Sequence, residues 1–402
     1  MPSSTLFISQ SYRPEPIGSG PYVTDMAEYL AAHGAEVEVL TTRPSYPEGV
    51  VSDGYRRGER DREMLNGVAV RRLRPWFTRK RGALGRLLRE AAFLASGLLR
   101  LASGAVRRRS RVVSLCPSIF AVLLGCAATR RGGRHIALVH DVQSGLAAGL
   151  SMLGNGRAVR ALQWLERQAL NRCDGVLVLS EPMREHLHSL GVTAPIDVLP
   201  IWIDTAAVQP RPARSNKFRT AMYSGNFGRK QALDQVLDMA AVLRGRGAPL
   251  RVLLRGQGSE TESLKARAAA RQLDNVRFEP LVPVERLAES LAEGDIHLVT
   301  QHPLIADFAV PSKVFAIMAA GRPIVAAAPP GSMLWSLQER CGGFLCVPSG
   351  DTEALAAAVE RLAGDSERCS ELGRRARDYV VQAHDKQRVL GDFLLHLDGA
   401  RA

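Results

Sequence analysis

Short apolar runs recur along the whole chain, and they constrain its fold more than any other feature. Each run has five to eight residues rich in Val, Ile, Leu and Ala, and stretches with helical periodicity separate one run from the next. Continuous runs of this kind are typical of parallel strands that helices cover on both faces. The sequence therefore predicts an α/β protein with buried parallel sheets, whose strands lie at 5–10, 36–42, 111–116, 135–141, 175–180 and 196–201 in the first half and at 218–225, 250–256, 276–281, 296–301, 323–328 and 343–347 in the second.

The length of 402 residues is too great for one ordinary α/β domain but suits two domains of about 200 residues each. Between the two groups of strands, 204–216 contains two prolines and lacks any periodicity, so we place the domain boundary there. We predict two Rossmann-like, doubly wound domains at 1–204 and 216–384, followed by a C-terminal helix within 385–402 that can pack back on the first domain. Doubly wound sheets bind ligands at the carboxyl ends of their strands, so the loops after the strands are the places to look for chemistry.

The six cysteines give no sign of a zinc or disulfide framework, because none of them forms a CxxC pair or a regular ladder of spacings. We expect buried, reduced thiols of a cytosolic protein, and we assign no metal site. The first residues lack the basic segment and apolar core of a signal peptide, and no stretch reaches about 18 apolar residues without a charge. We therefore expect neither a signal peptide nor a membrane span.

The positive charge of the chain is concentrated in one segment. Residues 56–111 contain 17 Arg or Lys and 4 acidic residues, an excess of 13 that equals the net charge of the whole chain. Such a segment indicates an anionic surface as its partner. Nucleic acid could use the same charge, but the sequence has no aromatic RNA-binding motif and no recognition-helix pattern. We expect an anionic membrane surface and no nucleic acid.

Within this basic segment, 84–106 has the periodicity of an amphipathic helix. We expect its arginines to meet anionic lipid, where each basic residue contributes on the order of 1 kcal/mol. The apolar stripe that we expect to pack on the sheet consists of Leu84, Leu87, Leu88, Ala91, Leu94, Ala95, Leu98, Leu99 and Ala102. The residues that we expect to face the membrane are Trp76, Phe77, Arg79, Lys80, Arg81, Arg86, Arg89, Phe93, Arg107, Arg108 and Arg109.

Two loops of the first half stand at positions suited to a ligand. Gly18, Ser19 and Gly20 follow the first strand and precede a helix, where glycines and free N–H groups allow phosphate to approach closely. Their spacing is not GxGxxG, so an ordinary strand-to-helix turn explains them equally well. His140 and Asp141 end the fourth strand, where they could position an acceptor hydroxyl, accept its proton or contact phosphate. A single His on an apolar strand is also often structural.

The second half opens with a stronger motif, YSGNFGRKQ at 223–231, directly after a strand. Gly225 and Asn226 begin the loop. Arg229 and Lys230 complement a diphosphate, because the guanidinium fork and the ammonium point charge both bind phosphate oxygens. Two cations are unfavourable at a helix start unless an anion is nearby, which favours a donor site over a solvated surface pair.

Two further loops follow strands of the second half. Gly256 and Gln257 lie in a glycine turn that forms either a wall of the donor pocket or only a tight turn. In the stretch DFAVPSKVFAIMAAGRP at 307–323, Ser312 is placed as the N-cap of a helix, and Lys313 is again a cation at the unfavourable helix end. The residues of this stretch that we expect to contact a donor are Asp307, Pro311, Ser312 and Lys313.

Taken in order, YSGNFGRKQ, VPSKVFAIMAAGRPIVA and GGFLCVPSGDTEALAAAV resemble the retaining family 4 glycosyltransferases, and in particular the colanic-acid type enzymes of bacterial exopolysaccharide and O-antigen synthesis. The resemblance covers nearly the whole chain. It implies the GT-B fold, in which two Rossmann-like domains face a central cleft, and sugar transfer with retention of anomeric configuration and without a metal or other cofactor. It also implies a UDP- or GDP-sugar donor and a polyprenyl-diphosphate-linked saccharide acceptor, held at the inner face of the cytoplasmic membrane.

The resemblance assigns roles to individual residues. Arg229 and Lys230 would hold the donor diphosphate, the loop at 18–20 would close on phosphate or sugar, and His140 and Asp141 would face the sugar and the acceptor. The leaving phosphate itself would help to deprotonate the acceptor, so fixed cations and N–H donors are required where negative charge develops on it. We therefore expect His140, Asp141, Arg229 and Lys230 to be the catalytic residues.

One departure from the family pattern concerns two glutamates that many members carry before the MAAGRP turn. Phe308 and Ala316, which have seven residues between them, stand at these positions here. Lys313, the helix start at Ser312 and the carboxylate of Asp307 are then expected to supply donor contacts. The departure keeps two other functions open, a catalytically inactive partner subunit of such an enzyme and a nucleotide-sugar epimerase of the same architecture. The retained cations favour the active enzyme, because a dead site has no need of them.

Overall fold

The computed structural model describes residues 4–15, 18–45, 50–74, 83–116, 118–140, 156–212, 219–302 and 311–399, without the side chains of 83, 84, 86, 156–159 and 162. The chain divides into two compact units, Met1–Pro200 with Leu390–Ala402 and Ile201–Val389. The sequence placed the division slightly later, within 204–216. The residues of our predictions that lie outside the described part of the chain are Trp76, Phe77, Arg79, Lys80, Arg81, Asp141, Asp307 and Phe308, together with the side chains of Leu84 and Arg86.

The first unit is built on an eight-stranded sheet with the order β3-β4-β2-β1-β5-β6-β7-β8. All neighbouring strands are parallel except β3 and β4. Because β2 and β5 lie on opposite sides of β1, the strand order reverses beside β1, as it does in doubly wound sheets. The strands are β1 (Ser4–Ile8), β2 (Glu36–Thr42), β3 (Arg62–Leu65), β4 (Val68–Leu73), β5 (Arg109–Cys116), β6 (Thr129–Val139), β7 (Gly175–Val178) and β8 (Ile196–Val198).

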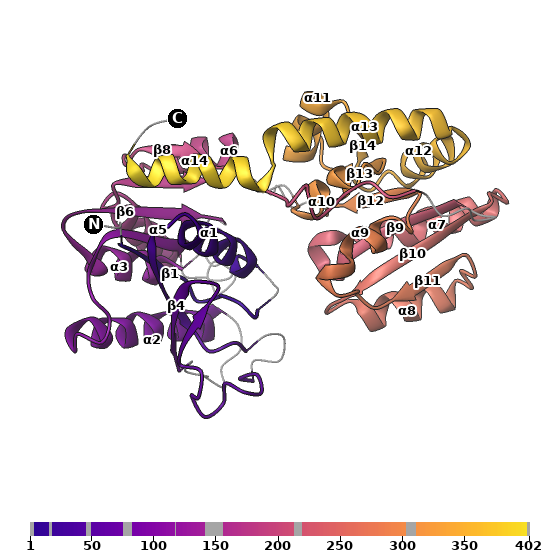
Figure 1. Cartoon of the computed structure of the whole chain (residues 1–402). Helices are drawn as coiled ribbons and strands as arrows, with labels where there is room; N and C mark the ends of the chain where they lie inside the picture. The colour runs from indigo at the N-terminus through magenta and orange to yellow at the C-terminus, as the bar shows by residue number, and fades with distance from the viewer. Residues whose placement is uncertain are drawn as a thin grey trace. The chain divides into compact units, whose positions relative to one another are not determined.

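Helices cover both faces of this sheet (Figure 1). Side chains alternate along β1, so that Leu6 and Ile8 pack in one core cluster with Phe93, whereas the ring of Phe7 lies 6.3 Å from that of Phe393. The helices are α1 (Gly20–Ala32), α2 (Ala83–Ala102), α3 (Ile119–Ala128), α5 (Gly156–Leu170), α6 (Glu181–Ser189) and α14 (Lys386–Asp398), the last of which belongs to the first unit from Leu390 onward.

The second unit contains a six-stranded sheet with the order β11-β10-β9-β12-β13-β14, in which every pair is parallel. The strand order reverses between β9 and β12. The strands are β9 (Arg219–Asn226), β10 (Leu250–Gln257), β11 (Val276–Glu279), β12 (Ile296–Thr300), β13 (Ile324–Ala328) and β14 (Leu345–Pro348). The α-helices are α7 (Asp234–Gly245), α8 (Thr261–Ala270), α9 (Leu287–Leu291), α10 (Lys313–Ala319), α11 (Met333–Cys341), α12 (Thr352–Gly364) and α13 (Ser366–Ala383), and the 3₁₀ helices are η1 (Arg229–Gln231) and η2 (Val284–Arg286).

All twelve predicted strands overlap strands of the structure, and the hairpin of β3 and β4 is an addition that the sequence analysis missed. Asn66 and Gly67 form its turn, with φ values of 47° and 81°. An Asn-Gly pair favours this left-handed backbone and is a strong hairpin signal. The hairpin lies in the basic segment 56–111, where Arg71 pairs with Glu38 and Arg72 with Glu63. Part of the positive charge of this segment is therefore neutralised by ion pairs within the first unit.

The predicted amphipathic helix is present as α2, but the face that packs on the unit is not the predicted one. Phe93 is only 4% exposed, whereas Leu99 is 71% exposed and Leu88 also faces solvent. A Cβ atom on Gly97 would collide with the side chain of Leu124, so the glycine allows α2 to lie close against α3 on this face. The expectation that Phe93 faces the membrane is wrong, and Leu88 and Leu99, which we expected to pack on the sheet, are exposed instead.

Arg109 is a second residue that was wrongly assigned to the membrane face. Its guanidinium lies 2.9 Å from carboxylates of both Glu36 and Glu38, at the start of β5. The sheet places the acids of β2 near this arginine, so Arg109 stabilises the strands instead of facing lipid. Arg89, Arg107 and Arg108 are exposed, as predicted. Within the described ranges, no helix is both long enough and apolar enough to cross a bilayer.

Candidate functional site

The loops that follow β9 and β12 lie beside the point where the strand order of the second sheet reverses. The backbone N–H of His302 donates to the carbonyl oxygen of Lys230 at 2.9 Å. The hydroxyl of Thr300 donates to the carbonyl oxygen of Gln231 at 2.6 Å. These bonds hold the predicted motif 223–231 against the end of β12. Crevices at such reversal points are where doubly wound sheets bind ligands.

Lys313, the first residue of α10, places a buried ammonium group at this edge. Its Nζ lies 3.6 Å from the centroid of the Tyr223 ring and 3.5 Å from where a Cβ of Gly225 would be. This nitrogen is buried and has no hydrogen-bond partner in the described part of the chain. Burial lowers the pKa of Lys313 to about 7. The aromatic face stabilises the cation in part, but no described residue supplies an anion to the ammonium.

Arg229 and Lys230 lie on η1 and point into solvent. The side chain of Arg229 is 90% exposed and makes only a loose ion pair with Glu260 at 3.5 Å. Ala232 then adopts a left-handed backbone with φ of 45°, and α7 begins later, at Asp234. The two cations therefore belong to a short turn before the helix. The sequence argument from the helix dipole does not apply to them, although both remain available to an anion.

The glycine turn after β10 is explained by packing. A Cβ atom on Gly256 would overlap the carbonyl oxygen of Gly225 and the ring of Phe227. Gly256 therefore permits the close approach of β9 and β10, which gives this glycine a structural reason whether or not it also lines a donor pocket. Gln257 and Asn226 face one another across the two strand ends and are both exposed.

Ser312 does not cap α10. Its side chain makes no capping hydrogen bond, and its backbone is already helical, whereas a capping residue is usually extended. Pro311 is half-buried and Ser312 is exposed. The predicted N-cap is therefore wrong, and among the described residues of this segment Lys313 is the one whose side chain lies against Tyr223 and Gly225. Ala316, at one of the two positions where the family pattern has glutamate, is buried in the core.

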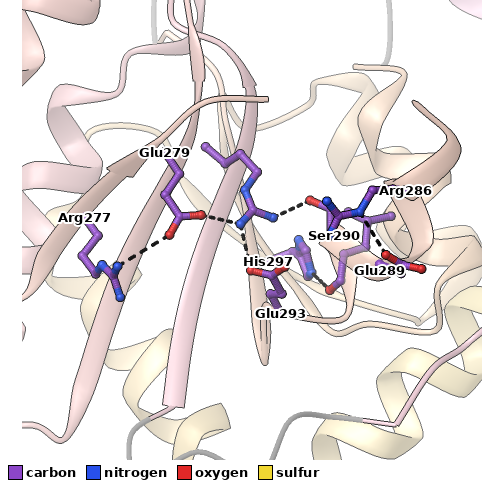
Figure 2. Close-up of polar contacts among 9 residues, drawn as sticks. Arg277, Glu279, Arg286, Glu289, Ser290, Glu293 and His297 are labelled. Carbon is purple, nitrogen blue, oxygen red and sulfur yellow. Dashed lines mark hydrogen bonds and ion pairs between the residues drawn. The ribbon is translucent and has the colours of Figure 1, made fainter. Parts of the chain in front are cut away.

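A second buried cation of this unit, Arg255, shows how such a charge is neutralised in the same sheet. Figure 2 labels its acceptors Glu279, Ser290 and Glu293. Arg255 is 3% exposed, and its guanidinium contacts carboxylates of Glu279 and Glu293, the latter at 2.8 Å. It also donates to the hydroxyl of Ser290 at 2.6 Å. A paired cation of this kind stabilises the fold. Lys313 has no such partners among the described side chains, so its charge is not neutralised in the way that the charge of Arg255 is.

The first unit brings His140 and the loop at 18–20 to one edge of its sheet. His140 follows β6, and its ring meets that of Tyr22 edge-on at a centroid distance of 5.3 Å. Tyr22 belongs to the first turn of α1, which begins at Gly20. The Nε2 atom of His140 is buried without a hydrogen-bond partner in the ranges that the structure describes. Burial lowers the pKa of His140 to about 4, so the ring is neutral at pH 7.

The glycines of this loop have local reasons for their presence. Gly18 has a φ of 58°, which favours glycine. A Cβ on Gly20 would lie 3.0 Å from the carbonyl oxygen of Glu15. Ser19 makes no capping hydrogen bond, so its side chain does not occupy the N–H groups of the first turn of α1, in which Pro21 has none.

Sequence reasoning missed two aromatic residues of these edges, Tyr22 and Tyr223. Tyr223 carries the ammonium of Lys313 on its ring, and its hydroxyl donates to the carbonyl oxygen of Asn226 at 2.8 Å. Tyr22 contacts His140. Tyr223 lies in the motif 223–231, and Tyr22 follows the loop at 18–20. The sequence did not reveal their roles, because each ring contacts a residue far away in the chain.

Known proteins resemble the chain over its whole length. Residues 18–202 match the family described as "Glycosyl transferase 4-like domain", and residues 205–379 match "Glycosyl transferases group 1". The chain is 30% identical over 406 residues to WcaI of Escherichia coli (strain K12), which is named as a colanic acid biosynthesis glycosyl transferase. This similarity covers 97% of the chain and 98% of WcaI.

Two solved structures share the fold. Sucrose-phosphate synthase from Thermosynechococcus elongatus has a TM-score of 0.74 at 19% identity, over 99% of this chain and 100% of the other. Anabaena HepE in complex with UDP-glucose has a TM-score of 0.70 at 15% identity, over 98% and 99% of the two chains. Both similarities extend over nearly the whole chain and show a shared fold.

Proposed function

Because the chain belongs to the family 4 glycosyltransferases and has their GT-B fold, we propose that it transfers a sugar from a UDP- or GDP-sugar to a lipid-linked saccharide. The name of WcaI supports exopolysaccharide synthesis as the process, with O-antigen synthesis as a related one. The complex of HepE with UDP-glucose supports a nucleotide sugar as the donor. A polyprenyl diphosphate is the lipid that we propose for the acceptor.

The observation that carries this proposal is the ammonium of Lys313, which has no partner among the described residues, together with two exposed cations on the loop that follows β9. The Nζ atom is buried between Tyr223 and Gly225, and the loop that ends in Arg229 and Lys230 starts at the same strand end. A diphosphate would supply the anion that Lys313 lacks. Arg229 and Lys230 would then cover its outer oxygens, as a guanidinium fork and an ammonium do in phosphate sites.

These cations would also make a metal ion unnecessary for transfer. Negative charge grows on the diphosphate as the bond to the sugar breaks, and fixed positive groups stabilise that charge in the transition state. We propose transfer with retention of anomeric configuration, in which the departing phosphate accepts the proton of the acceptor hydroxyl. His140, which is neutral and whose Nε2 has no partner in the part of the chain that the structure describes, would hydrogen-bond to the sugar. The N–H groups at the start of α1 would contact phosphate or sugar.

We propose that α2 and the residues after it hold the protein on an anionic membrane surface, at the inner face of the cytoplasmic membrane. Leu88, Leu98 and Leu99 are exposed on α2, and Arg89 and Arg100 are exposed beside them. Exposed leucines together with arginines are typical of helices that lie in the headgroup region of anionic lipid. A lipid-linked acceptor would be found at the same surface.

A donor screen tests the proposal. Purified protein is incubated with a panel of UDP- and GDP-sugars and a lipid-diphosphate saccharide, with EDTA present throughout, and the anomeric configuration of the product is determined by NMR. We expect transfer from one donor with retention. Transfer that requires added Mg²⁺, or product of inverted configuration, would contradict the proposed mechanism.

The burial of Ala316 where many relatives have glutamate favours one alternative, a catalytically inactive partner subunit. That alternative predicts nucleotide binding without transfer to any acceptor, and recovery of transfer when a second protein is added. The same screen therefore separates the two functions.

A further inference from the structure

Three potential metal ligands from different elements of the first unit meet under α3. They are Cys126 near the end of α3, His135 in β6 and Cys173 just before β7. The Nδ1 atom of His135 lies 3.6 Å from the Sγ atoms of both Cys126 and Cys173. All three ligand atoms lie within 4.8 Å of one another. The sequence analysis expected isolated thiols, because these residues are nine and 38 positions apart and form no motif.

The distances match those of a tetrahedral zinc site. Zinc binds thiolate sulfur at about 2.3 Å and imidazole nitrogen at about 2.0–2.1 Å, so neighbouring sulfur and nitrogen ligands of one tetrahedral ion lie about 3.6 Å apart. Both sulfur–nitrogen distances of the cluster have this value. The ligands would need little movement to bind the ion.

The orientation of His135 is also suitable. Its Nε2 atom lies 2.8 Å from the hydroxyl oxygen of Ser114 on β5. If Nε2 donates this bond, Nδ1 carries the lone pair and faces the two sulfurs, as in sites where an outer partner holds a metal-binding histidine. A Cβ on Gly125 would overlap the imidazole, so this glycine lets α3 lie directly on the ring.

The backbone holds the third ligand in place. The N–H of His135 donates to the carboxylate of Asp174 at 2.8 Å, and the N–H of Asp174 donates to the carbonyl oxygen of His135, also at 2.8 Å. This pair of bonds fixes Cys173, the neighbour of Asp174, relative to the imidazole.

We propose that Cys126, His135 and Cys173 bind one zinc ion, with a water molecule in the fourth position. Two thiolates and one imidazole select zinc over hard cations such as Mg²⁺. Cys126 is half-buried, which gives the ion a way in and leaves room for water. The site is independent of the proposed transfer reaction, because His135 precedes His140 by five residues of extended strand, about 16 Å. The zinc ion stabilises α3, β6 and the start of β7.

Metal analysis of the purified full-length chain tests the site. We expect one zinc ion per chain after gel filtration, and a Co²⁺ derivative with the thiolate charge-transfer and visible bands of a tetrahedral site. Zinc binding should be lost in Cys126→Ser and in Cys173→Ser. Cys346→Ser is the matched control, since it alters a half-buried cysteine of the second unit and should leave the zinc content unchanged.

Ser114→Ala provides a milder test that does not remove a ligand. It should weaken zinc about 10- to 100-fold in competition with a chromophoric chelator, because the imidazole loses its outer partner. Zinc-free protein should unfold at a lower temperature than the zinc-bound form, and nucleotide binding by the second unit should be unaffected. Six freely titrating thiols without zinc, a Cys126–Cys173 disulfide found by mass spectrometry in metal-free protein, or full zinc binding by both serine variants would each overturn the proposal.

Discussion

The two units present chemically different edges at the carboxyl ends of their sheets. The second unit offers three cations, of which Lys313 is buried and unpaired within the described residues and Arg229 and Lys230 are exposed. The first unit offers a neutral histidine, an aromatic ring and backbone N–H groups. Under the proposed function, the edge of the second unit would bind a dianion and the edge of the first unit would bind uncharged hydroxyl groups. The difference lies in the side chains of the loops.

The largest effect is expected from Lys313→Met, which removes the charge but keeps an apolar side chain of similar length. Transfer should fall about 10²- to 10³-fold in kcat, as it does when a preorganised group that stabilises transition-state charge is removed. The fold should be retained, because burial disfavours the charged form of the lysine. Lys265→Met is the control, since Lys265 is exposed and paired with Glu262. Full activity of Lys313→Met would show that the donor diphosphate does not bind at Lys313.

Arg229→Ala and Lys230→Ala should each reduce turnover by about 10- to 100-fold, the cost of one or two charge-assisted hydrogen bonds. The affinity for the nucleotide diphosphate, measured by calorimetry, should fall in parallel, and the melting temperature should stay unchanged because both side chains are exposed. Arg286→Ala, an exposed arginine of the same unit, is the comparison variant. Equal activity of all three variants would mean that these cations do not bind the donor.

The lowered pKa of Lys313 predicts opposite pH dependences for the stability of the fold and for donor affinity. Its pKa is about 7 in the folded chain and 10.5 ordinarily, so the unfolded chain binds more protons between these values. Stability should therefore rise with pH from about 7 to 10.5, and Lys313→Met should remove this rise. Donor affinity should change in the opposite direction, falling above about pH 7 by at most about tenfold per pH unit, because a diphosphate binds the ammonium form. Donor affinity that does not change between pH 7 and 9 would contradict this role of the lysine.

His140→Gln should have a smaller effect, about tenfold on kcat, since it alters a neutral hydrogen bond. The ring of His140 is neutral above about pH 5, because burial lowers its pKa to about 4. The pH profile of the wild type above pH 5 should therefore be unchanged in the variant. His33→Gln, at the exposed end of α1, is the control. A new or lost inflection near pH 6.5 would show that His140 is charged during the reaction.

The smallest effects concern the membrane. Arg107→Gln and Arg108→Gln should each weaken binding to vesicles containing anionic lipid about fivefold, in line with about 1 kcal/mol per basic residue. Arg109→Gln should leave vesicle binding nearly unchanged but lower the melting temperature, because Arg109 pairs with Glu36 and Glu38. Co-sedimentation with vesicles and thermal unfolding measure the two quantities. Equal loss of vesicle binding in all three variants would show that Arg109 contacts lipid, as the sequence predicted, and would contradict its structural role.

Local patterns predicted much of the fold but less of the candidate site. The apolar runs located the strands, and the glycines and cations of 223–231 located a loop at a reversal of strand order. The N-cap at Ser312 was wrong because the residue is already helical, and the face of α2 was wrong because Gly97 and Leu124 decide it. An Asn-Gly turn would have revealed the hairpin of β3 and β4, so that omission was avoidable.

By itself, the sequence determined that this chain forms two parallel-sheet domains with phosphate-binding residue types after their strands. Such information is local, because helix and strand periodicities of 3.6 and 2.0 residues are properties of neighbouring positions. Only the tertiary structure decided which arginines are paired, that Lys313 lies on the ring of Tyr223, and that Cys126, His135 and Cys173 meet. The physical reason is that burial and pairing depend on contacts between residues far apart in the chain, and no periodicity within one segment specifies them.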